Sequence, residues 1–308
     1  MKIFSGSSNQ ALAQKVAKVM EMSVSPVEVF VFPDGERRIQ IQEDVVDEET
    51  VVVQSTNTPV DTHYIELFFI IDGLLRSGAK SVTLVMPYMG YQRQDHVFRD
   101  GEAVSLDVVV KLLEALKVDR VITFDPHTIK LREFFQTDVV DLSALSLFAQ
   151  FIKEKGWDSA DTVLVSPDMG GLRRIKKMSS MLGNMNWIAT VKDRDLDTGS
   201  ILINRFEGPL PVAELKDKRA LMVDDMISSG KTISECASFL KSNGVKEIQV
   251  FATHPIFSKD APKLLQVSNA DMVYVSDSVW IPEEKRFEKL KILSIAEMIA
   301  GELRKINQ

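Results

Sequence analysis

The fold is decided by the stretch Ala220-Leu221-Met222-Val223-Asp224-Asp225-Met226-Ile227-Ser228-Ser229-Gly230-Lys231-Thr232. An apolar run leads into two carboxylates, and a turn of small residues then opens a helix. This order is typical of a buried strand in an open α/β sheet, where ligands bind at the carboxyl ends of strands. The carboxylates would accept sugar hydroxyls, and the backbone N–H groups at the helix start would hold a phosphate. The stretch therefore predicts an α/β fold with a candidate sugar phosphate site.

The same turn has two other interpretations. Gly230-Lys231-Thr232 matches the end of a P-loop, but a P-loop needs a glycine five residues before Gly230, and that residue is Asp225. A Walker-type NTPase is therefore disfavoured. The turn also fits an acidic strand end followed by an ordinary helix with Ser228 or Ser229 as N-cap. From the turn alone, this interpretation and the sugar phosphate site are equally supported.

Length and composition are those of a globular protein with two domains. A chain of 308 residues is long for one hydrophobic core, since cores stop growing near about 250 to 300 residues. It is 45% hydrophobic and 26% charged, and apolar runs such as 67–71 are too short to span a bilayer. The N-terminus lacks the apolar core of a signal peptide. We therefore expect no membrane association.

The net charge and the cysteine content limit the class of ligand and the cellular compartment that we expect. The net charge of −7 argues against a nucleic-acid-binding protein and favours a small ligand. A single cysteine, Cys236, excludes disulfide stapling of the chain and is typical of a reducing cytoplasm. We therefore expect a cytoplasmic protein that acts on a small molecule.

Helix and strand patterns alternate along almost the whole chain, which predicts α/β architecture with parallel sheets. In the helix near residue 70, Ile65, Phe68, Phe69, Asp72 and Leu75 mark a mostly apolar face. The expected strands are 29–32, 51–54, 82–86, 121–124, 163–166, 187–191, 220–223, 248–253 and 272–275. The expected helices are 9–20, 61–77, 106–116, 143–155, 171–182, 232–243 and 295–306.

Two similar segments support a duplicated architecture. Residues 75–85 and 240–250 each contain a helix end, a glycine, a basic residue and a buried strand, although any two joints of this kind share that chemistry. We expect an N-terminal domain at 1–142 and a C-terminal domain at 143–308, where a fresh helix begins. The last helix is a candidate to pack back on the N-terminal domain.

Polar residues follow three of the expected strands. His127 comes just after one strand, Asp168 after a second, and Asp224 and Asp225 after a third. Carboxylates with one imidazole suit Mg²⁺, which takes one or two protein ligands and keeps waters and substrate phosphates. For His127 alone, a core or capping histidine is the better interpretation. Beside Asp168 at a parallel strand end, a metal ligand is favoured.

The turn Asp168-Met169-Gly170-Gly171 leaves the backbone nearly bare just before a helix. Paired glycines let N–H groups approach an anion, as a diphosphate site requires. A strained turn without a ligand is the alternative. The ligand is favoured because Arg173 and Arg174 follow at once.

A third turn carries an aromatic ring and two acids. Phe32, Asp34 and Glu36 lie just past an expected strand. An adenine can stack on Phe32 while an acid accepts a hydrogen bond from its exocyclic amine. A β-turn with solvated acids explains these residues equally well.

Two longer segments carry cations. A non-helical segment follows the strand 82–86 and carries Arg93 and Arg99, which can grip phosphate oxygens bidentately. Lys192 and Arg194 follow another strand. A solvated charged hairpin is the common interpretation of that segment, and a mobile loop that stabilises developing charge during phosphoryl transfer is the functional one.

Taken together, these segments closely resemble the ribose-phosphate pyrophosphokinase family, whose members are also called phosphoribosyl-pyrophosphate (PRPP) synthetases. No single motif decides the resemblance, but all of them in order along nearly the whole chain are highly specific. The matching motifs are Phe4-Ser5-Gly6-Ser7, Phe32-Pro33-Asp34-Gly35-Glu36, Pro87-Tyr88 with Tyr91, Arg93-Gln94-Asp95, Asp125-Pro126-His127, Ser166-Pro167-Asp168-Met169-Gly170-Gly171, Lys192 with Arg194, and the run from Val223 to Thr232.

The resemblance implies two phosphoribosyltransferase-like domains, each a mainly parallel sheet flanked by helices, with the ATP and ribose 5-phosphate sites between them. Enzymes of this family transfer the β,γ-diphosphoryl group of MgATP to the anomeric hydroxyl of ribose 5-phosphate and release AMP. The resemblance further implies Mg²⁺ as cofactor and a cytoplasmic homo-oligomer built from dimers, as a hexamer or a tetramer.

Site residues are carried over by position. ATP would be held by Phe32, Asp34, Glu36, Arg93, Gln94 and Asp95, some from a neighbouring subunit, and Mg²⁺ by His127 and Asp168. Asp224 and Asp225 would take the ribose hydroxyls, and Ser228, Ser229, Gly230, Lys231 and Thr232 would cradle the 5-phosphate. The diphosphate would lie in the turn of Asp168, Met169, Gly170 and Gly171. Lys192 and Arg194 would lie on a flexible catalytic loop and stabilise the transferring group.

The chain departs from the family pattern at three places. Ser228-Ser229 stands where the family has an acid followed by Thr, so one carboxylate is absent, although backbone N–H groups can still bind the phosphate. Lys231 stands where a small residue is usual and adds a cation. Residues 96–105 look more like divergent or archaeal members, which leaves phosphate activation, ADP inhibition and the hexamer open.

Two other functions remain open. A PRPP-consuming phosphoribosyltransferase would share the Asp224-Asp225 loop but would not explain the N-terminal half. An inactive regulatory subunit would keep the fold without the catalysis. Four residues speak against that subunit, whereas Ser228 is compatible with it; the four are Lys192, Arg194, His127 and Asp168.

Overall fold

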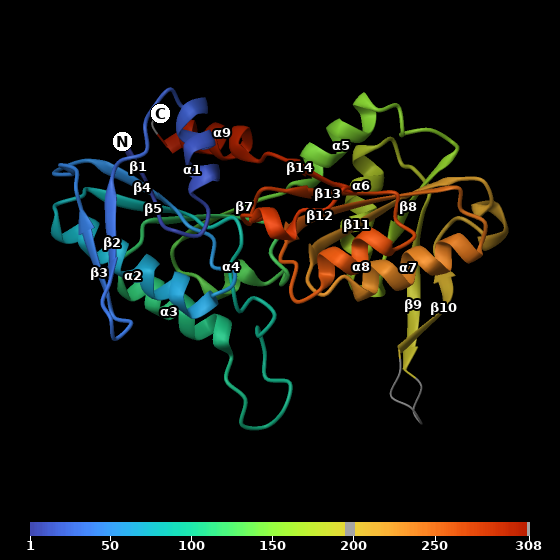
Figure 1. Cartoon of the computed structure of the whole chain (residues 1–308), viewed down its shortest axis with the longest axis horizontal. Helices are drawn as coiled ribbons and strands as arrows, with labels where there is room; N and C mark the ends of the chain where they lie inside the picture. Colours follow the sequence, from blue (N-terminus) through green and yellow to red (C-terminus); the bar gives the residue numbers. More distant parts are fainter. Residues whose placement is uncertain (195–200, 307–308) are drawn as a thin grey trace. The chain divides into compact units, whose positions relative to one another are not determined.

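The computed structural model describes residues 1–194 and 201–306, except the side chains of 192–194 and 201–204. The chain divides into two compact units (Figure 1). The first comprises Met1–Ser143, Ser278–Trp280 and Ser294–Gln308, and the second comprises Ala144–Asp277 and Ile281–Leu293. Each unit has its own sheet. Among the described residues, no helix has the length and apolar character needed to cross a membrane.

The first unit is built on a five-stranded sheet in the order β1-β4-β5-β6-β7, in which every neighbouring pair is parallel. Helix α9 packs on α1, where Arg304 donates a hydrogen bond to the Val19 carbonyl over 2.7 Å. The strands are β1 (Lys2–Ser5), β4 (Glu49–Val53), β5 (Ser81–Val85), β6 (Arg120–Phe124) and β7 (Asp138–Leu142). The helices are α1 (Gln10–Val19), α2 (Val60–Arg76), α3 (Ser105–Ala115), α4 (Leu131–Phe134) and α9 (Ala296–Ile306).

A separate antiparallel hairpin belongs to the same unit. It pairs β2 (Val27–Val31) with β3 (Arg37–Ile41). Helix α2 packs against β3, and a side chain at Gly73 would meet Ile41 at 3.3 Å. The glycine thus permits the close approach of helix and hairpin.

The apolar face expected of α2 is only partly turned to the core, which Phe68 and Leu75 contact. Ile65 and Phe69 are 45% and 42% exposed. The helix is apolar nearly all round, so its periodicity does not select one face. The apolar residues that α2 buries in the core of the unit are Tyr64, Leu67, Ile70, Ile71 and Leu74.

The second unit is built on a seven-stranded sheet in the order β10-β9-β8-β11-β12-β13-β14. Every neighbouring pair is parallel except β9 and β10. The strands are β8 (Thr162–Ser166), β9 (Trp187–Arg194), β10 (Ile201–Glu207), β11 (Arg219–Ile227), β12 (Glu247–Pro255), β13 (Met272–Ser276) and β14 (Leu290–Leu293). The helices are α5 (Leu145–Glu154), α6 (Leu172–Met181), α7 (Lys231–Ser242) and α8 (Ala261–Val267), with short 3₁₀ turns at Met169–Gly171, Val212–Leu215 and Glu283–Lys285.

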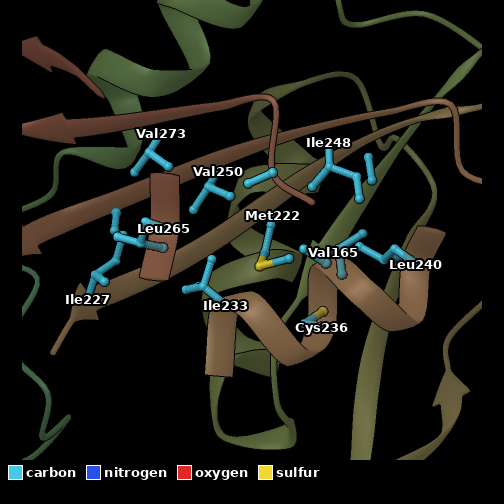
Figure 2. Packing of buried hydrophobic residues seen from close by; sticks show 14 of the residues in the cluster. Val165, Met222, Ile227, Ile233, Cys236, Leu240, Ile248, Val250, Leu265 and Val273 are labelled. Carbon is cyan, nitrogen blue, oxygen red and sulfur yellow. The ribbon is translucent and has the colours of Figure 1, made fainter. Parts of the chain in front are cut away.

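The core of the second unit holds its central strands in place. Val165 of β8 and Met222 of β11 pack with Ile233, Cys236 and Leu240 of α7 (Figure 2). Strands β8 and β11 are buried over nearly their whole length, as parallel strands covered on both faces are. The cysteine is a buried core residue. The ends of these strands are thus anchored by packing.

The expected α/β class, with mainly parallel sheets flanked by helices, is confirmed, and several boundaries are corrected. Strand β11 does not end at Val223 but continues to Ile227, because β12 pairs with it as far as Pro255. Asp224 and Asp225 therefore lie within the strand. The N-cap of α7 is Gly230, not a serine. Strands β3, β7, β10 and β14 were not expected from the sequence.

Candidate active site

The carboxyl ends of neighbouring strands form the candidate site of the second unit. Strands β8 and β11 pair in parallel, with Val165 opposite Met222. The residues that follow β8 and those at the end of β11 therefore lie at one edge of the sheet. This is the edge at which open parallel sheets bind ligands.

The Asp168–Gly171 turn is held by bonds within itself. The Asp168 carboxylate accepts a hydrogen bond from Gly171 N over 3.1 Å, and Ser166 Oγ donates to the Asp168 carbonyl over 2.7 Å. A side chain at Gly171 would lie 2.3 Å from Ser166 Oγ, so only glycine fits. The Gly171 N–H is thus engaged within the turn, while the exposed Gly170 leaves the backbone beside it bare, as a diphosphate site requires.

The two acids of β11 share one cation. Arg174 Nη1 lies 3.0 Å from Asp224 Oδ1, and Nη2 lies 3.2 Å from Asp225 Oδ2. Burial raises the pKa of Asp224 well above its ordinary value, and the charge of Asp225 raises it further, whereas Arg174 lowers it. The arginine therefore offsets the repulsion between the carboxylates.

The turn between β11 and α7 enters the helix through a glycine. Gly230 has φ of +77°, in the left-handed region that favours glycine, and it caps α7. The first N–H groups of a helix have no partner within the helix and can bind a phosphate. Ser228 Oγ is bonded to Ser258 Oγ at 3.2 Å, and Ser229 and Lys231 are exposed.

The proposed catalytic cations lie on β9. This strand pairs in parallel with β8, with Ser166 opposite Ala189, so its last residues extend past the same sheet edge. Lys192 and Arg194 belong to β9 by their backbones. Their side chains lie outside what the structure describes.

In the first unit, the loops that follow β5 and β6 meet. These strands are parallel neighbours, with Val85 opposite Ile122. The backbone N–H of His127 donates to Gln92 Oε1 over 2.7 Å, and Gln92 is 1% exposed. Gln92 thus ties the loop that carries Arg93 and Asp95 to the loop that carries His127.

Both loops line one pocket of about 440 Å³. Burial alone would raise the pKa of Asp95, but hydrogen bonds from Thr128 and His96 outweigh it and hold the pKa below its ordinary value. The pocket combines cations with aromatic and apolar surface, which suits a nucleotide. Its lining residues are Arg93, Asp95, His96, Phe98, His127, Thr128, Ile129 and Lys130.

The other residues assigned to ATP do not line this pocket. Phe32, Asp34 and Glu36 occupy the exposed tip of the β2–β3 hairpin, where Asp34 accepts a hydrogen bond from Glu36 N over 3.1 Å. Gln94 is exposed and accepts a backbone bond from Leu106 N. Within one chain, the structure therefore brings Arg93, Asp95 and His127 together and leaves the hairpin residues apart.

Comparison with known proteins identifies the family. Residues 1–116 match the model of the N-terminal domain of ribose phosphate pyrophosphokinase, and residues 200–308 match the phosphoribosyl synthetase-associated domain. A ribose-phosphate pyrophosphokinase of Fusobacterium nucleatum is 35% identical over 306 residues, which cover 99% of this chain and 95% of the relative. The chain belongs to the ribose-phosphate pyrophosphokinase family. The resemblance inferred from the motifs is thereby confirmed.

Other members of the ribose-phosphate pyrophosphokinase family match as completely. The enzyme of Bacillus caldolyticus is 33% identical over 99% of this chain and 94% of its own length. The crystal structure of phosphoribosylpyrophosphate synthetase from Mycobacterium smegmatis superposes with a TM-score of 0.91 at 32% identity, and covers 99% of this chain and 98% of that one. The fold of the whole chain is therefore that of the family.

The contacts of two residues in the candidate sites of this pyrophosphokinase family member were not predicted from the sequence. Arg174 was interpreted as a cation for an anionic ligand because it follows the glycine turn, but it pairs with Asp224 and Asp225. Gln92 carried no signal, since its role is a bond to the backbone of a residue 35 positions away. Only a spacing rule that joins adjacent parallel strand ends could have suggested either contact.

Proposed function

We propose that this chain is a ribose-phosphate diphosphokinase. It transfers the β,γ-diphosphoryl group of ATP to the 1-hydroxyl of ribose 5-phosphate and gives PRPP and AMP. In this step the 1-hydroxyl oxygen bonds to the β-phosphorus, the bond from that phosphorus to the α-phosphate oxygen breaks, and the hydroxyl loses its proton. The full-length match to the family carries the proposal.

The second unit contains the residues that we assign to ribose 5-phosphate. Asp224 and Asp225 supply acceptors for the ribose hydroxyls, and the turn Ser228–Thr232 supplies backbone donors for the 5-phosphate. The Asp168–Gly171 turn supplies donors for the diphosphate. We assign these roles because the three features lie at the ends of β8 and β11, which are neighbours in one sheet.

The first unit contains the residues that we assign to ATP. Arg93, Asp95 and His127 line one pocket, and its cations suit the charge of a triphosphate. Phe32, Asp34 and Glu36 would complete a nucleotide site from a neighbouring subunit, since they are exposed at a hairpin tip of their own chain.

We assign Mg²⁺ to His127 and Asp168, as the resemblance implies. One oxygen of Asp168 caps Gly171, and the other makes no hydrogen bond with any residue that the structure describes, so this carboxylate fits a metal ligand. Among the side chains that the structure describes, no three of His, Cys, Asp or Glu gather as a metal cage. Mg²⁺ needs none, because it keeps waters and binds substrate phosphates. When bound, it would neutralise phosphate charge.

The chain's own groups then position the reactants rather than react covalently. Phosphoryl transfer depends on alignment and charge stabilisation. The carboxylates orient the ribose, the backbone turns hold the phosphates, and Lys192 and Arg194 stabilise charge on the transferring group. The single buried cysteine fits the reducing cytoplasm expected from the sequence.

We also propose a homo-oligomer. Ile65 and Phe69 on α2, and Val108 and Leu112 on α3, are between 42% and 51% exposed. The two residues of each pair are four positions apart, so they form one apolar patch on their helix. Exposed apolar patches of this kind mark protein–protein interfaces. Light scattering is expected to give a multiple of the 34.6 kDa chain mass, and Phe69→Lys with Leu112→Lys is expected to lower it. A monomeric wild type would contradict the assembly.

Steady-state assays with MgATP and ribose 5-phosphate separate the three candidate functions. We expect AMP to form only when both substrates are present. A phosphoribosyltransferase would consume added PRPP with a nucleobase and would make no AMP from ATP. An inactive subunit would do neither at any phosphate concentration. The N-terminal match at residues 1–116 favours the diphosphokinase over the phosphoribosyltransferase.

A further inference from the structure

Arg174 lies between two parts of the candidate site of the second unit. It is the third residue of α6, the helix that follows the Asp168–Gly171 turn directly. Its guanidinium reaches Asp224 at 3.0 Å and Asp225 at 3.2 Å. A guanidinium presents its N–H donors in a planar fork, so one arginine can fix two carboxylates at once.

The backbone holds each carboxylate from a second side. Asp224 Oδ1 accepts a hydrogen bond from Asp225 N over 2.9 Å, and Asp225 Oδ1 accepts one from Met226 N over 2.8 Å. The side chain of Arg174 is 18% exposed, and those of the two acids are 14% and 7% exposed. Removing one partner of such a buried group leaves a charge uncompensated, and the remaining side chains must rearrange.

The glycine turn leaves the room that Arg174 needs. A side chain at Gly171 would lie 3.3 Å from Arg174 Nη1. The guanidinium therefore lies against the bare backbone of the turn on one side and against the acids on the other. A shift of the turn would move the arginine, and a shift of the arginine would move the acids.

We propose that Arg174 is a positioning residue of the ribose 5-phosphate site. It holds Asp224 and Asp225 in the orientation in which they accept the ribose hydroxyls, and it ties that orientation to the Asp168–Gly171 turn. The inference rests on the proposed function of this site. Arg174 itself need not touch the substrate.

Lys177 supplies a control on the same helix. It is exposed, and it makes no ion pair with any residue in the described part of the chain. Lys177→Met removes one positive charge from α6 without touching the acids.

The test is steady-state kinetics of wild type, Arg174→Met, Arg174→Lys and Lys177→Met, with each substrate varied separately. We expect Arg174→Met to raise KM for ribose 5-phosphate at least about tenfold, with KM for ATP within about twofold of wild type. Arg174→Lys should reverse part of the rise in KM for ribose 5-phosphate, because lysine keeps the positive charge but lacks the planar fork of N–H donors. Lys177→Met should leave both KM values within about twofold of wild type.

An unchanged KM for ribose 5-phosphate in Arg174→Met would overturn the proposal, as would an equal rise in both KM values. Thermal melting monitors folding. If Arg174→Met does not fold, Arg174→Gln, which keeps N–H donors without the charge, takes its place under the same criteria.

Calorimetry with ribose 5-phosphate alone separates this inference from the proposed function. If the wild type binds ribose 5-phosphate but forms no AMP, the proposed reaction fails, and loss of binding in Arg174→Met would still support the positioning role. Equal binding by both proteins would overturn that role. A wild type that neither binds nor turns over ribose 5-phosphate would overturn both.

Discussion

The backbone N–H of His127 donates a 2.7 Å hydrogen bond to Oε1 of Gln92. The bond joins the loops after β5 and β6, whose residues line one pocket. Gln92 is almost fully buried, and its Nε2 has no hydrogen-bond partner in the described part of the chain. An unsatisfied buried donor is costly, so the bond to His127 is the contact that accounts for a glutamine here.

Gln92→Met tests this link. Methionine has a similar volume but cannot accept the His127 N–H, so the loop that carries His127 should lose its anchor. We expect KM for ATP to rise several-fold, with a loss of stability of at most about 1–3 kcal/mol. Gln136→Met, at an exposed glutamine of the same unit, should change neither value. If both variants behave alike, Gln92 does not position His127.

Lys192→Ala should abolish most of the catalytic rate. If Lys192 stabilises charge in the transition state, kcat falls at least about a hundredfold, the scale seen when one such donor is removed. Unfolding should be unaffected. The control is Lys177→Ala, at an exposed lysine on α6. A wild-type kcat in Lys192→Ala would remove this residue from the mechanism.

The raised pKa of Asp224 predicts the pH dependence of stability. Burial and the charge of Asp225 raise it above the ordinary value of 3.8, so the folded state binds more protons than the unfolded state. This contribution to stability is present at low pH and is lost as the pH rises through the raised pKa. Asp224→Asn should therefore gain stability relative to wild type as the pH increases.

Denaturant unfolding of both proteins between about pH 5 and 8 measures this difference. A constant offset is expected from the altered contact with Arg174, so the sign of the slope is the result that matters. Asp158→Asn, at an exposed aspartate of the same unit, serves as control. A difference between wild type and Asp224→Asn that is independent of pH would contradict the raised pKa.

Gly230 and Gly301 form a matched pair for backbone strain. Gly230 has φ of +77°, so Gly230→Ala should destabilise the protein by about 1–2 kcal/mol. Gly301 lies within α9, where a side chain would meet nothing within 4 Å, so Gly301→Ala should stabilise it by about 0.5–1 kcal/mol. Chemical denaturation measures both. Equal effects of the two substitutions would argue against strain at Gly230.

Part of the candidate site could be predicted from the sequence, because a parallel sheet places the carboxyl ends of its strands at one edge. Asp168 and His127 each follow a strand that its apolar run reveals, and Asp224 lies in the last part of another. Where β11 stops could not be predicted, since its length is set by pairing with β12 as far as Pro255. A strand boundary of this kind depends on a partner that a local pattern does not contain.

Contacts between residues far apart in the chain also could not be predicted from the sequence. Arg174 and Asp224 are 50 positions apart, and nothing in either segment indicates that the arginine faces acids rather than a ligand. The exposure of two apolar residues of α2 could not be predicted for a related reason. Ile65 and Phe69 are as apolar as the buried residues, so hydrophobicity alone could not tell the core side from the outside.

The central claim is tested most directly by ³¹P nuclear magnetic resonance of the protein with MgATP and ribose 5-phosphate. We predict that AMP appears together with an equal amount of a diphosphate attached to C1 of ribose 5-phosphate, and that ADP does not form. Formation of ADP with a singly phosphorylated anomeric position, or no loss of ATP at all, would contradict diphosphoryl transfer.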